Sequence, residues 1–172
     1  MDNTNEYNHG ESEIQSVTEP PYVRLSQKYI SDLSFKIIGC AIEVHKHLGP
    51  GLLESVYHQC LFEELQLQGL WVQSKVRVPV NYKGRELGDV LEIDLLVENI
   101  IVIELKAVES LHPVFKAQLL SYLKLSDKPK GLLINFHVET IAGSIVSLVT
   151  DEFAKLDRKS TRLNSSHSLP TR

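Results

Sequence analysis

Two carboxylates and a lysine fall at fixed distances in a segment that alternates like a β-hairpin, and this constrains the fold more than any other feature. Nine residues separate Asp94 from the run Glu104-Leu105-Lys106. Strand side chains alternate between faces, so Glu104 and Lys106 share one face while Leu105 points to the other. With an odd number of residues in the turn at 98–100, Asp94 lies opposite Glu104. The sequence therefore predicts two strands that gather three charged groups.

Two neighbouring carboxylates repel each other unless a positive charge lies between them. A divalent metal ion is the usual partner, because its preferred ligands are carboxylate and other oxygens. Lys106 stands one step further along the same row, and the set predicts metal-dependent phosphodiester chemistry. Taken alone, Glu104 and Lys106 fit a solvated strand face better, and a D-x(n)-E-x-K string occurs often by chance.

Hydrophobic periodicity predicts one domain of the α/β class, with the order helix, helix, three strands, helix, strand, helix. A strand, a crossover helix and another strand imply a parallel pair. We therefore expect a mixed β-sheet, an antiparallel three-stranded meander plus one parallel strand, flanked by helices. Ser31 or Asp32 is the expected cap of the first helix. The expected elements are residues 31–48, 52–67, 75–80, 88–97, 100–108, 113–125, 132–136 and 140–153.

Both ends of the chain differ from this domain, which we place at residues 22–156. Residues 1–21 are polar and acidic, and we expect a disordered leader. Residues 157–172 begin DRKSTRLNSSH, which resembles the conceptual translation of a sequencing adapter. We expect this tail to be non-native. The alternative is a basic, disordered native tail.

Charge and cysteine content exclude several classes. The formal net charge is −4. The suspect tail carries four basic residues and one acidic residue, so residues 1–156 carry −7. That balance argues against tight nonspecific DNA binding. Two cysteines give neither a disulfide framework nor a zinc or iron–sulfur site, and they suit a reducing cytoplasm. The chain shows no signal peptide and no apolar run of about 20 residues. We therefore expect a cytoplasmic protein without a membrane partner.

Two further motifs extend the Asp94…Glu104-Leu105-Lys106 pattern. The run from Gly51 to Tyr57 reads GxxExxY, the signature of a small bacterial family, and the run from Gln118 to Tyr122 reads QxxxY, as in RecB-like and Cas4-like nucleases. With these motifs the chain resembles the PD-(D/E)XK nuclease superfamily over roughly residues 33–138. The resemblance implies a restriction-endonuclease-like core. It also implies a nuclease whose favoured substrate is DNA rather than RNA.

The resemblance also implies a role for each matching position. Asp94 and Glu104 would bind Mg²⁺ or Mn²⁺, with the backbone carbonyl of Leu105 and the carboxylate of Glu54 as further ligands. Lys106 would orient the attacking water or stabilise charge on the phosphate. Gln118 would take part in both catalysis and nucleic-acid binding, and Tyr122 would take part in nucleic-acid binding. Two positions depart from the pattern: Ile93 replaces proline, and Phe115 stands where many GxxExxY proteins carry histidine.

Each of these positions also has a structural interpretation. Glu54 fits a helix N-terminus, where the helix dipole favours a negative charge. Tyr57 fits packing better than catalysis, Gly51 fits a backbone turn, and Gln118 fits a polar helix surface. For the whole chain, the alternatives to a nuclease are a non-catalytic nucleic-acid-binding or protein-binding module and a subunit that is active only with a protein partner. The sequence does not predict an oligomeric state.

Overall fold

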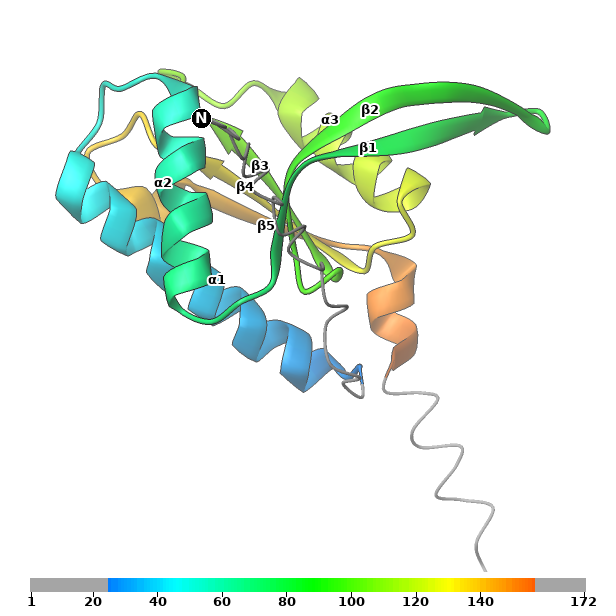
Figure 1. Cartoon of the computed structure of the whole chain (residues 1–172), viewed down its shortest axis with the longest axis horizontal. Coiled ribbons are helices and arrows are strands. Elements are labelled where there is room, and N and C mark those ends of the chain that lie inside the picture. Colours follow the sequence, from blue (N-terminus) through cyan, green and yellow to red (C-terminus); the bar gives the residue numbers. More distant parts are fainter. Residues whose placement is uncertain (1–24, 157–172) are drawn as a thin grey trace, which may run out of the picture.

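The computed structural model describes residues 25–156, apart from the side chains of residues 89 and 90. Its elements are α1 (Gln27–Leu48), α2 (Glu54–Leu67), β1 (Val72–Tyr82), β2 (Arg85–Val97), β3 (Ile101–Lys106), α3 (Pro113–Leu125), β4 (Lys130–Asn135), the 3₁₀ turn η1 (Ile141–Ser144) and β5 (Ile145–Val149). The strands form one sheet in the order β1-β2-β3-β4-β5 (Figure 1). All neighbours are antiparallel except β3 and β4.

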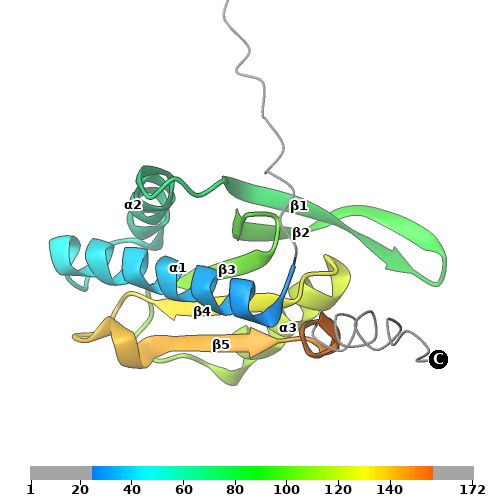
Figure 2. The ribbon, with the colours of Figure 1, turned by 90° about the horizontal axis from the view of Figure 1, so that it is seen from below.

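This topology confirms the predicted fold class. The meander β1–β2–β3 is antiparallel, and β4 is the parallel strand reached through α3. Parallel neighbours need a long crossover, and α3 supplies it. Helices α1 and α2 cover one face of the sheet and α3 covers the other (Figures 1 and 2). The result is a three-layer arrangement with a hydrophobic core on each side of the sheet.

The predicted C-terminal helix at residues 140–153 is wrong. The segment forms η1 and then β5, which pairs antiparallel with β4. The run Ile-Val-Ser-Leu-Val at 145–149 is rich in β-branched residues, which favour a strand, and Gly143 disfavours a helix before it. In this segment, α-helical backbone appears only after β5, at residues 151–156. Pairing with an open strand edge thus prevails over a spacing that resembled a helix.

The expected cap of the first helix is also wrong. Helix α1 begins at Gln27, and the hydroxyl of Ser26 accepts a hydrogen bond from the backbone N–H of Tyr29 at 3.1 Å. This bond satisfies one of the free N–H groups of the first turn. Neither Ser31 nor Asp32 lies at the helix start. The predicted α3 matches at both ends, and the predicted ends of α1, α2 and β2 match too, while the remaining boundaries shift by a few residues.

Strand β3 connects the two cores and places the charged residues. Its fully buried residues Ile101 and Ile103 belong to the core with α1 and α2, and Val102 belongs to the core with α3. Burying each such side chain contributes about 1.5–3 kcal/mol. By alternation, Glu104 and Lys106 continue the face of Val102. Hydrophobic packing therefore fixes which side of the sheet carries the two charges.

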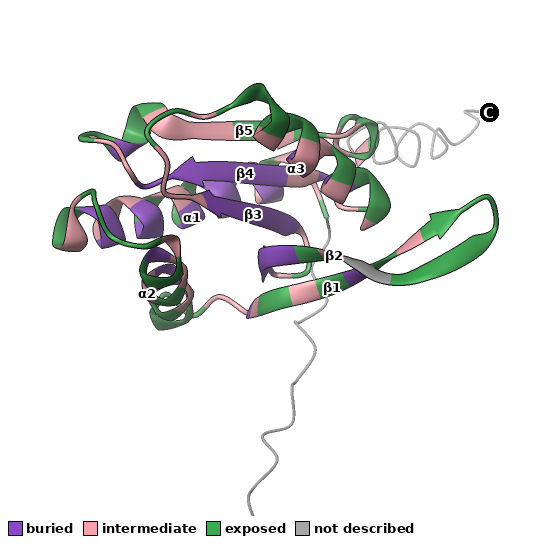
Figure 3. Ribbon diagram, turned by 90° about the horizontal axis from the view of Figure 1, so that it is seen from above, coloured by how far each residue is buried: buried purple, intermediate pink, exposed green. Residues whose placement is uncertain are grey.

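The β1–β2 ribbon extends well beyond the sheet (Figures 1 and 3). Its two-residue turn, Lys83 and Gly84, has positive φ at both positions, as in the tight turns that fit twisted hairpins. Eight consecutive residues around this turn, 81–88, are exposed, and we call them the arm. At the base of the same ribbon, residues 93–97 of β2 are buried, while β1 mixes buried and exposed residues. One pair of strands therefore joins the core to a solvent-exposed projection.

The predicted leader, residues 1–21, and the predicted tail, residues 157–172, lie outside the described residues. Within residues 25–156, no helix combines the length and the hydropathy needed to cross a membrane.

Candidate active site

Asp94 and Glu104 lie on neighbouring antiparallel strands. Leu95 pairs with Ile103, and the next residues in this register are Asp94 and Glu104. Both carboxylates are buried, with 7% and 4% of each residue exposed. The backbone N–H of Leu105 donates to Asp94 Oδ2 at 2.9 Å. The hairpin therefore brings the two acids together as the spacing predicts.

Two lysines neutralise this pair of acids. Lys106 Nζ lies 2.7 Å from Glu104 Oε1, and Lys75 Nζ lies 2.7 Å from Asp94 Oδ1. Lys75 also approaches Glu92 Oε1 at 3.5 Å. Burial acts to lower the pKa of both lysines, but their hydrogen bonds and attraction to the carboxylates raise each pKa overall. The site thus combines two negative and two positive groups.

Glu104 carries an oxygen without a partner. Oε2 is buried and accepts no hydrogen bond from any described residue. Burial raises the pKa of Glu104, and the charge of Asp94 raises it further, while Lys106 lowers it. A buried unpaired acceptor costs about 1–3 kcal/mol. The fold therefore maintains a carboxylate oxygen that is poised to accept an external positive group.

The loop before α2 presents Glu54 to this site. Gly51 has a φ of 101°, a backbone conformation that favours glycine. Tyr57 is fully buried; its hydroxyl donates to the Gly49 carbonyl at 2.6 Å and accepts from the Leu52 N–H at 3.1 Å. The structural interpretations of Gly51 and Tyr57 are thus confirmed. These two residues fix the loop, and Glu54 is the first residue of the helix that follows.

Glu54 and Asp94 line one small pocket of about 160 Å³. Leu105 and Lys75 line it too, as does His58, one helical turn after Glu54. The Nε2 atom of His58 lies 3.1 Å from the backbone carbonyl oxygen of Asp94. The pocket therefore joins α2 to the central strands, and Glu54 is the second carboxylate in its wall, beside Asp94.

The QxxxY residues form a contact of their own. Gln118 Nε2 donates to the Tyr122 hydroxyl at 2.9 Å on α3. No described contact joins either residue to Lys106. Instead, the ring of Phe115 lies 5.3 Å from Lys106 Nζ, within the range of a cation–π interaction. Phe115 thus lies beside the lysine of the site.

The donor set fits magnesium or manganese rather than zinc. Among the described residues, no three His, Cys, Asp or Glu side chains gather closely enough to hold a metal ion by themselves. Mg²⁺ takes one or two carboxylates and keeps several waters, whereas structural zinc needs a closed set of ligands. Asp94 and Glu104, with the unpaired Oε2, supply what a magnesium-like ion needs from the protein.

Sequence reasoning missed two members of the site, Lys75 and His58. Lys75 reads as an outward residue of an alternating strand. His58 reads as a histidine on the edge of the apolar stripe of a helix. The spacing of four residues from Glu54 is the one signal that places His58 on the same helix face.

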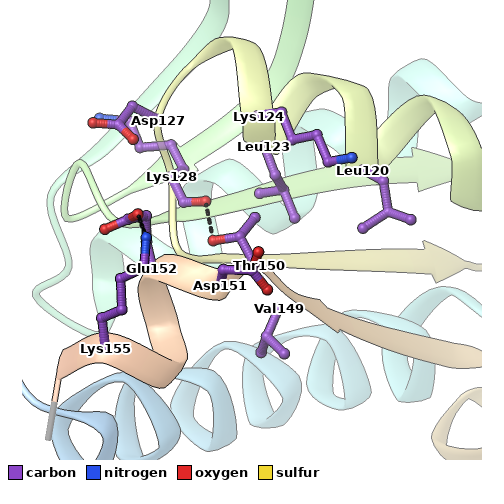
Figure 4. A pocket seen from close by; sticks show the side chains of 10 residues that line it. All are labelled: Leu120, Leu123, Lys124, Asp127, Lys128, Val149, Thr150, Asp151, Glu152 and Lys155. Carbon is purple, nitrogen blue, oxygen red and sulfur yellow. Dashed lines mark hydrogen bonds and ion pairs between the residues drawn. The ribbon is translucent and has the colours of Figure 1, made fainter. Parts of the chain in front are cut away.

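A larger pocket, of about 370 Å³, lies at the far edge of the sheet between the end of α3 and the residues after β5 (Figure 4). Acidic and basic side chains line it together. Among them, Lys155 Nζ lies 2.5 Å from Glu152 Oε1, and the Thr150 hydroxyl donates to the Lys128 carbonyl at 3.3 Å. None of the residues expected at the active site lines this pocket. We therefore place the candidate site at Asp94 and Glu104.

Comparison with known proteins gives one match. A family model described as the PD-(D/E)XK nuclease superfamily matches residues 31–146. This range contains Glu54, Asp94, Lys106, Gln118 and their neighbours in the site. Neither a curated protein nor a solved structure matches the chain.

Proposed function

The chain belongs to the PD-(D/E)XK nuclease superfamily, and from this premise we propose that it is a metal-dependent nuclease that hydrolyses phosphodiester bonds, with DNA as the preferred substrate over RNA. One observation carries the proposal. Asp94 and Glu104 lie side by side and buried, Lys106 contacts one oxygen of Glu104, and the other oxygen has no partner among the described residues. A buried cluster with an unpaired carboxylate oxygen costs folding free energy, whereas phosphodiester hydrolysis needs such a cluster.

Asp94 and Glu104 would hold Mg²⁺ or Mn²⁺, together with the backbone carbonyl of Leu105 and, from across the pocket, Glu54. When bound, such an ion activates water and polarises the scissile phosphate. The protein residues align the carboxylates for this purpose. The Leu105 N–H fixes Asp94 Oδ2, and hydrophobic packing of β3 fixes Glu104.

Lys106 would stabilise the negative charge that develops on the phosphate oxygens, or orient the water that attacks. The side chain of Lys106 is 13% exposed. Its ammonium contacts Glu104 on one side and the ring of Phe115 on the other. A cation held in place before the reaction needs no reorganisation during it. Gln118 and Tyr122, which hold each other on α3, would contact the phosphate backbone next to the lysine.

The arm would supply the nucleic-acid contacts that the acidic body lacks. Lys83 lies in its turn and Arg85 follows the turn, and Tyr82 is 59% exposed, with Lys83 Nζ 5.4 Å from its ring centre. Cations bind phosphates, and an exposed aromatic ring can stack on a base. The formal charge of the chain is −4, so a local group of cations matters more here than the net charge.

Within the superfamily, we assign the chain to the GxxExxY family and to the QxxxY variant found in RecB-like and Cas4-like members. The loop geometry supports this assignment, since Gly51 adopts a positive φ and Tyr57 ties the loop with two hydrogen bonds. The motif then reads as a scaffold, with Glu54 as its chemical group.

A second function, a binding module or a subunit that needs a protein partner, is favoured by the negative net charge. A basic partner would supply the phosphate contacts, while Asp94, Glu104 and Lys106 would remain available. This alternative predicts that the isolated chain binds nucleic acid weakly and cleaves it slowly or not at all.

The test is cleavage of labelled single-stranded and duplex DNA and RNA by the full chain, with Mg²⁺, with Mn²⁺ and with chelator. Asp94→Asn and Lys106→Ala are purified in parallel. The matched controls are Asp32→Asn and Lys28→Ala, because this exposed pair, 2.6 Å apart on α1, undergoes the same chemical changes away from the site. Metal-dependent cleavage lost only in the first two variants supports the proposal. Equal cleavage in all five proteins reveals a contaminant and rejects it.

A further inference from the structure

Lys75 has a backbone conformation that its residue type disfavours. It lies within β1 with a φ of 52°, in the left-handed region, although it is not a glycine. Such outliers persist where the surrounding structure imposes them, and they cluster at functional sites. The β1–β2 ladder is regular on both sides of it, since Ser74 pairs with Leu95 and Val76 with Ile93. The ladder itself omits a pair between Lys75 and Asp94, so the unusual backbone interrupts the pairing at the position where the lysine faces this carboxylate.

The register of the ribbon aims Lys75 at the site. Tyr82 pairs with Arg85 at the turn, and counting back from this pair would place Lys75 opposite Glu92. Two irregularities, on either side of Pro79, shift the register by two residues. Lys75 consequently lies across from Asp94, the carboxylate at the centre of the candidate site.

The contacts show what Lys75 does there. The backbone N–H of Leu105 takes one acceptor site on Asp94 Oδ2, and Lys75 Nζ binds Oδ1 at 2.7 Å, so a cation at Oδ1 meets the ammonium directly. A divalent ion at the same oxygen and an ammonium this close would repel strongly in a partly buried site. Metal binding to Asp94 therefore requires Lys75 to move.

Lys75 has somewhere to go. Its side chain is 49% exposed and opens onto the pocket shared with Glu54 and His58. A lysine ammonium is a mobile point charge on a flexible stem and binds phosphate as well as carboxylate. Once displaced from Asp94, it remains tethered at the position where the substrate phosphate must approach the two acids.

We propose that Lys75 is an exchangeable counter-ion of the active site: its ammonium neutralises Asp94, competes with the divalent cation for Oδ1, and then pairs with a phosphate of the substrate. The inference rests on the proposed function for its last step only. It gives Lys75 a positioning role toward the carboxylate and a binding role toward phosphate.

The test compares Lys75→Met, which keeps the length of the side chain without the charge, with Lys75→Arg, which keeps the charge. Isothermal titration of chelator-treated full chain with Mn²⁺, without nucleic acid, measures cation affinity. Lys75→Met should bind Mn²⁺ roughly fivefold more tightly, because a competing ion pair is gone. Lys75→Arg should stay near wild type. Lys28→Met, which breaks the exposed pair with Asp32, should change nothing.

Cleavage kinetics at saturating Mn²⁺ provide the second readout. Lys75→Met should raise the KM for nucleic acid by about tenfold with a smaller change in kcat, since one phosphate contact is lost. Tighter metal binding together with weaker substrate binding is a signature that simple misfolding cannot produce. Thermal unfolding of each variant verifies the fold.

Unchanged or weaker Mn²⁺ binding by Lys75→Met overturns the inference, even if the enzyme cleaves nucleic acid. Absence of Mn²⁺ binding in every protein also overturns it. The expected shift in Mn²⁺ affinity without any cleavage has the opposite meaning: the competition by Lys75 stands and the nuclease proposal fails.

Discussion

The base and the arm of the β1–β2 ribbon use the same two strands for opposite purposes. At the base, Asp94 is buried and held by a lysine and a backbone N–H. In the arm, residues 81–88 are all exposed, with Lys83 in the turn and Arg85 after it. The ribbon therefore holds a buried, ion-paired carboxylate where it joins the core and exposed cations where it leaves the core.

The difference lies in what fixes each side chain. Asp94 cannot move far, because sheet pairing and buried neighbours on both faces determine its position. The arm is held by its own ladder, by the bond from the Gly84 N–H to Asn81 Oδ1 at 3.0 Å and by Lys83 over the Tyr82 ring, contacts that all lie within the ribbon. Groups that react need the first kind of support, whereas groups that contact a long, variable polymer tolerate the second. Changes at the base should therefore affect chemistry and stability, and changes in the arm should affect binding.

The largest expected effect is that of Glu104→Gln on cleavage. Losing the carboxylate removes a metal ligand, and a bound ion contributes several kcal/mol of transition-state stabilisation. A loss of about 4 kcal/mol corresponds to roughly 10³-fold in rate. Single-turnover cleavage of labelled DNA measures it.

Glu86→Gln makes the same chemical change in the exposed arm and is the control. It should leave cleavage within about twofold, as expected for a surface site. If both variants lost activity equally, the contrast between base and arm would be wrong. If neither did, Glu104 would not belong to the active site.

Tyr57→Phe should have the next largest effect, on the free energy of unfolding. The change removes a hydroxyl that bonds the carbonyl of Gly49 and the N–H of Leu52, leaving both without this partner. The expected loss is about 1–3 kcal/mol. Urea unfolding followed by circular dichroism measures it.

Tyr82→Phe, in the arm, is the matched change, since Tyr82 is 59% exposed. Its unfolding free energy should stay within about 0.5 kcal/mol of wild type. Equal losses in the two variants would show that the Tyr57 hydroxyl bonds do not stabilise the loop before α2.

How much of the site the sequence could reveal depends on the distance along the chain. Asp94 and Glu104 belong to one hairpin with a short turn, so alternation and a count of residues suffice to pair them. Lys75 reaches Asp94 only through two register irregularities around Pro79. No periodicity encodes such shifts, because they depend on how the twisted ribbon packs over the sheet.

The fold followed a similar rule. Elements with a strong local signal, such as α3 with proline at its first position, were predictable. Strand β5 was not, since its identity depends on the open edge of β4 and not on its own spacing. The contacts of Gln118 were also beyond sequence reasoning. Its motif gave the helix face, but the structure shows that its side chain bonds Tyr122.

Reversing the charge of the arm tests its proposed role in binding. Lys83→Glu combined with Arg85→Glu should weaken DNA binding by about tenfold, or about 1.4 kcal/mol. If both side chains contact phosphates, the slope of log K against log salt should fall by about two. Fluorescence anisotropy with Glu104→Gln as the background measures binding without cleavage.

Length dependence sharpens this prediction. Along β1, Lys75 and Lys83 are at most about 26 Å apart, given the rise of a strand. This length corresponds to about eight nucleotides of a duplex. DNA that extends fewer than about eight nucleotides beyond the site should bind equally well to the Glu104→Gln protein with and without the charge reversal in the arm. A loss that is independent of length would place the contact elsewhere.

The smallest expected effect is the pH dependence of stability that Glu104 causes in chelator. Burial, then the charge of Asp94, raise the pKa of Glu104 above its ordinary value of 4.5, so the folded state favours the protonated form. Its contribution to stability is complete below the unfolded pKa and is lost as the pH rises through the folded pKa. Glu104→Gln cannot lose a proton, yet its amide oxygen can still accept from Lys106. The variant should therefore match wild type near pH 4 and become the more stable of the two as the pH rises toward 8.

Glu86→Gln, in the arm, should follow wild type throughout. Urea unfolding at a series of pH values decides the matter. A wild-type protein that gains stability over Glu104→Gln as the pH rises would show that the site stabilises the charged carboxylate even without metal. Glu104 and Lys106, on β3 beside the base of the ribbon, would then be a structural ion pair like any other.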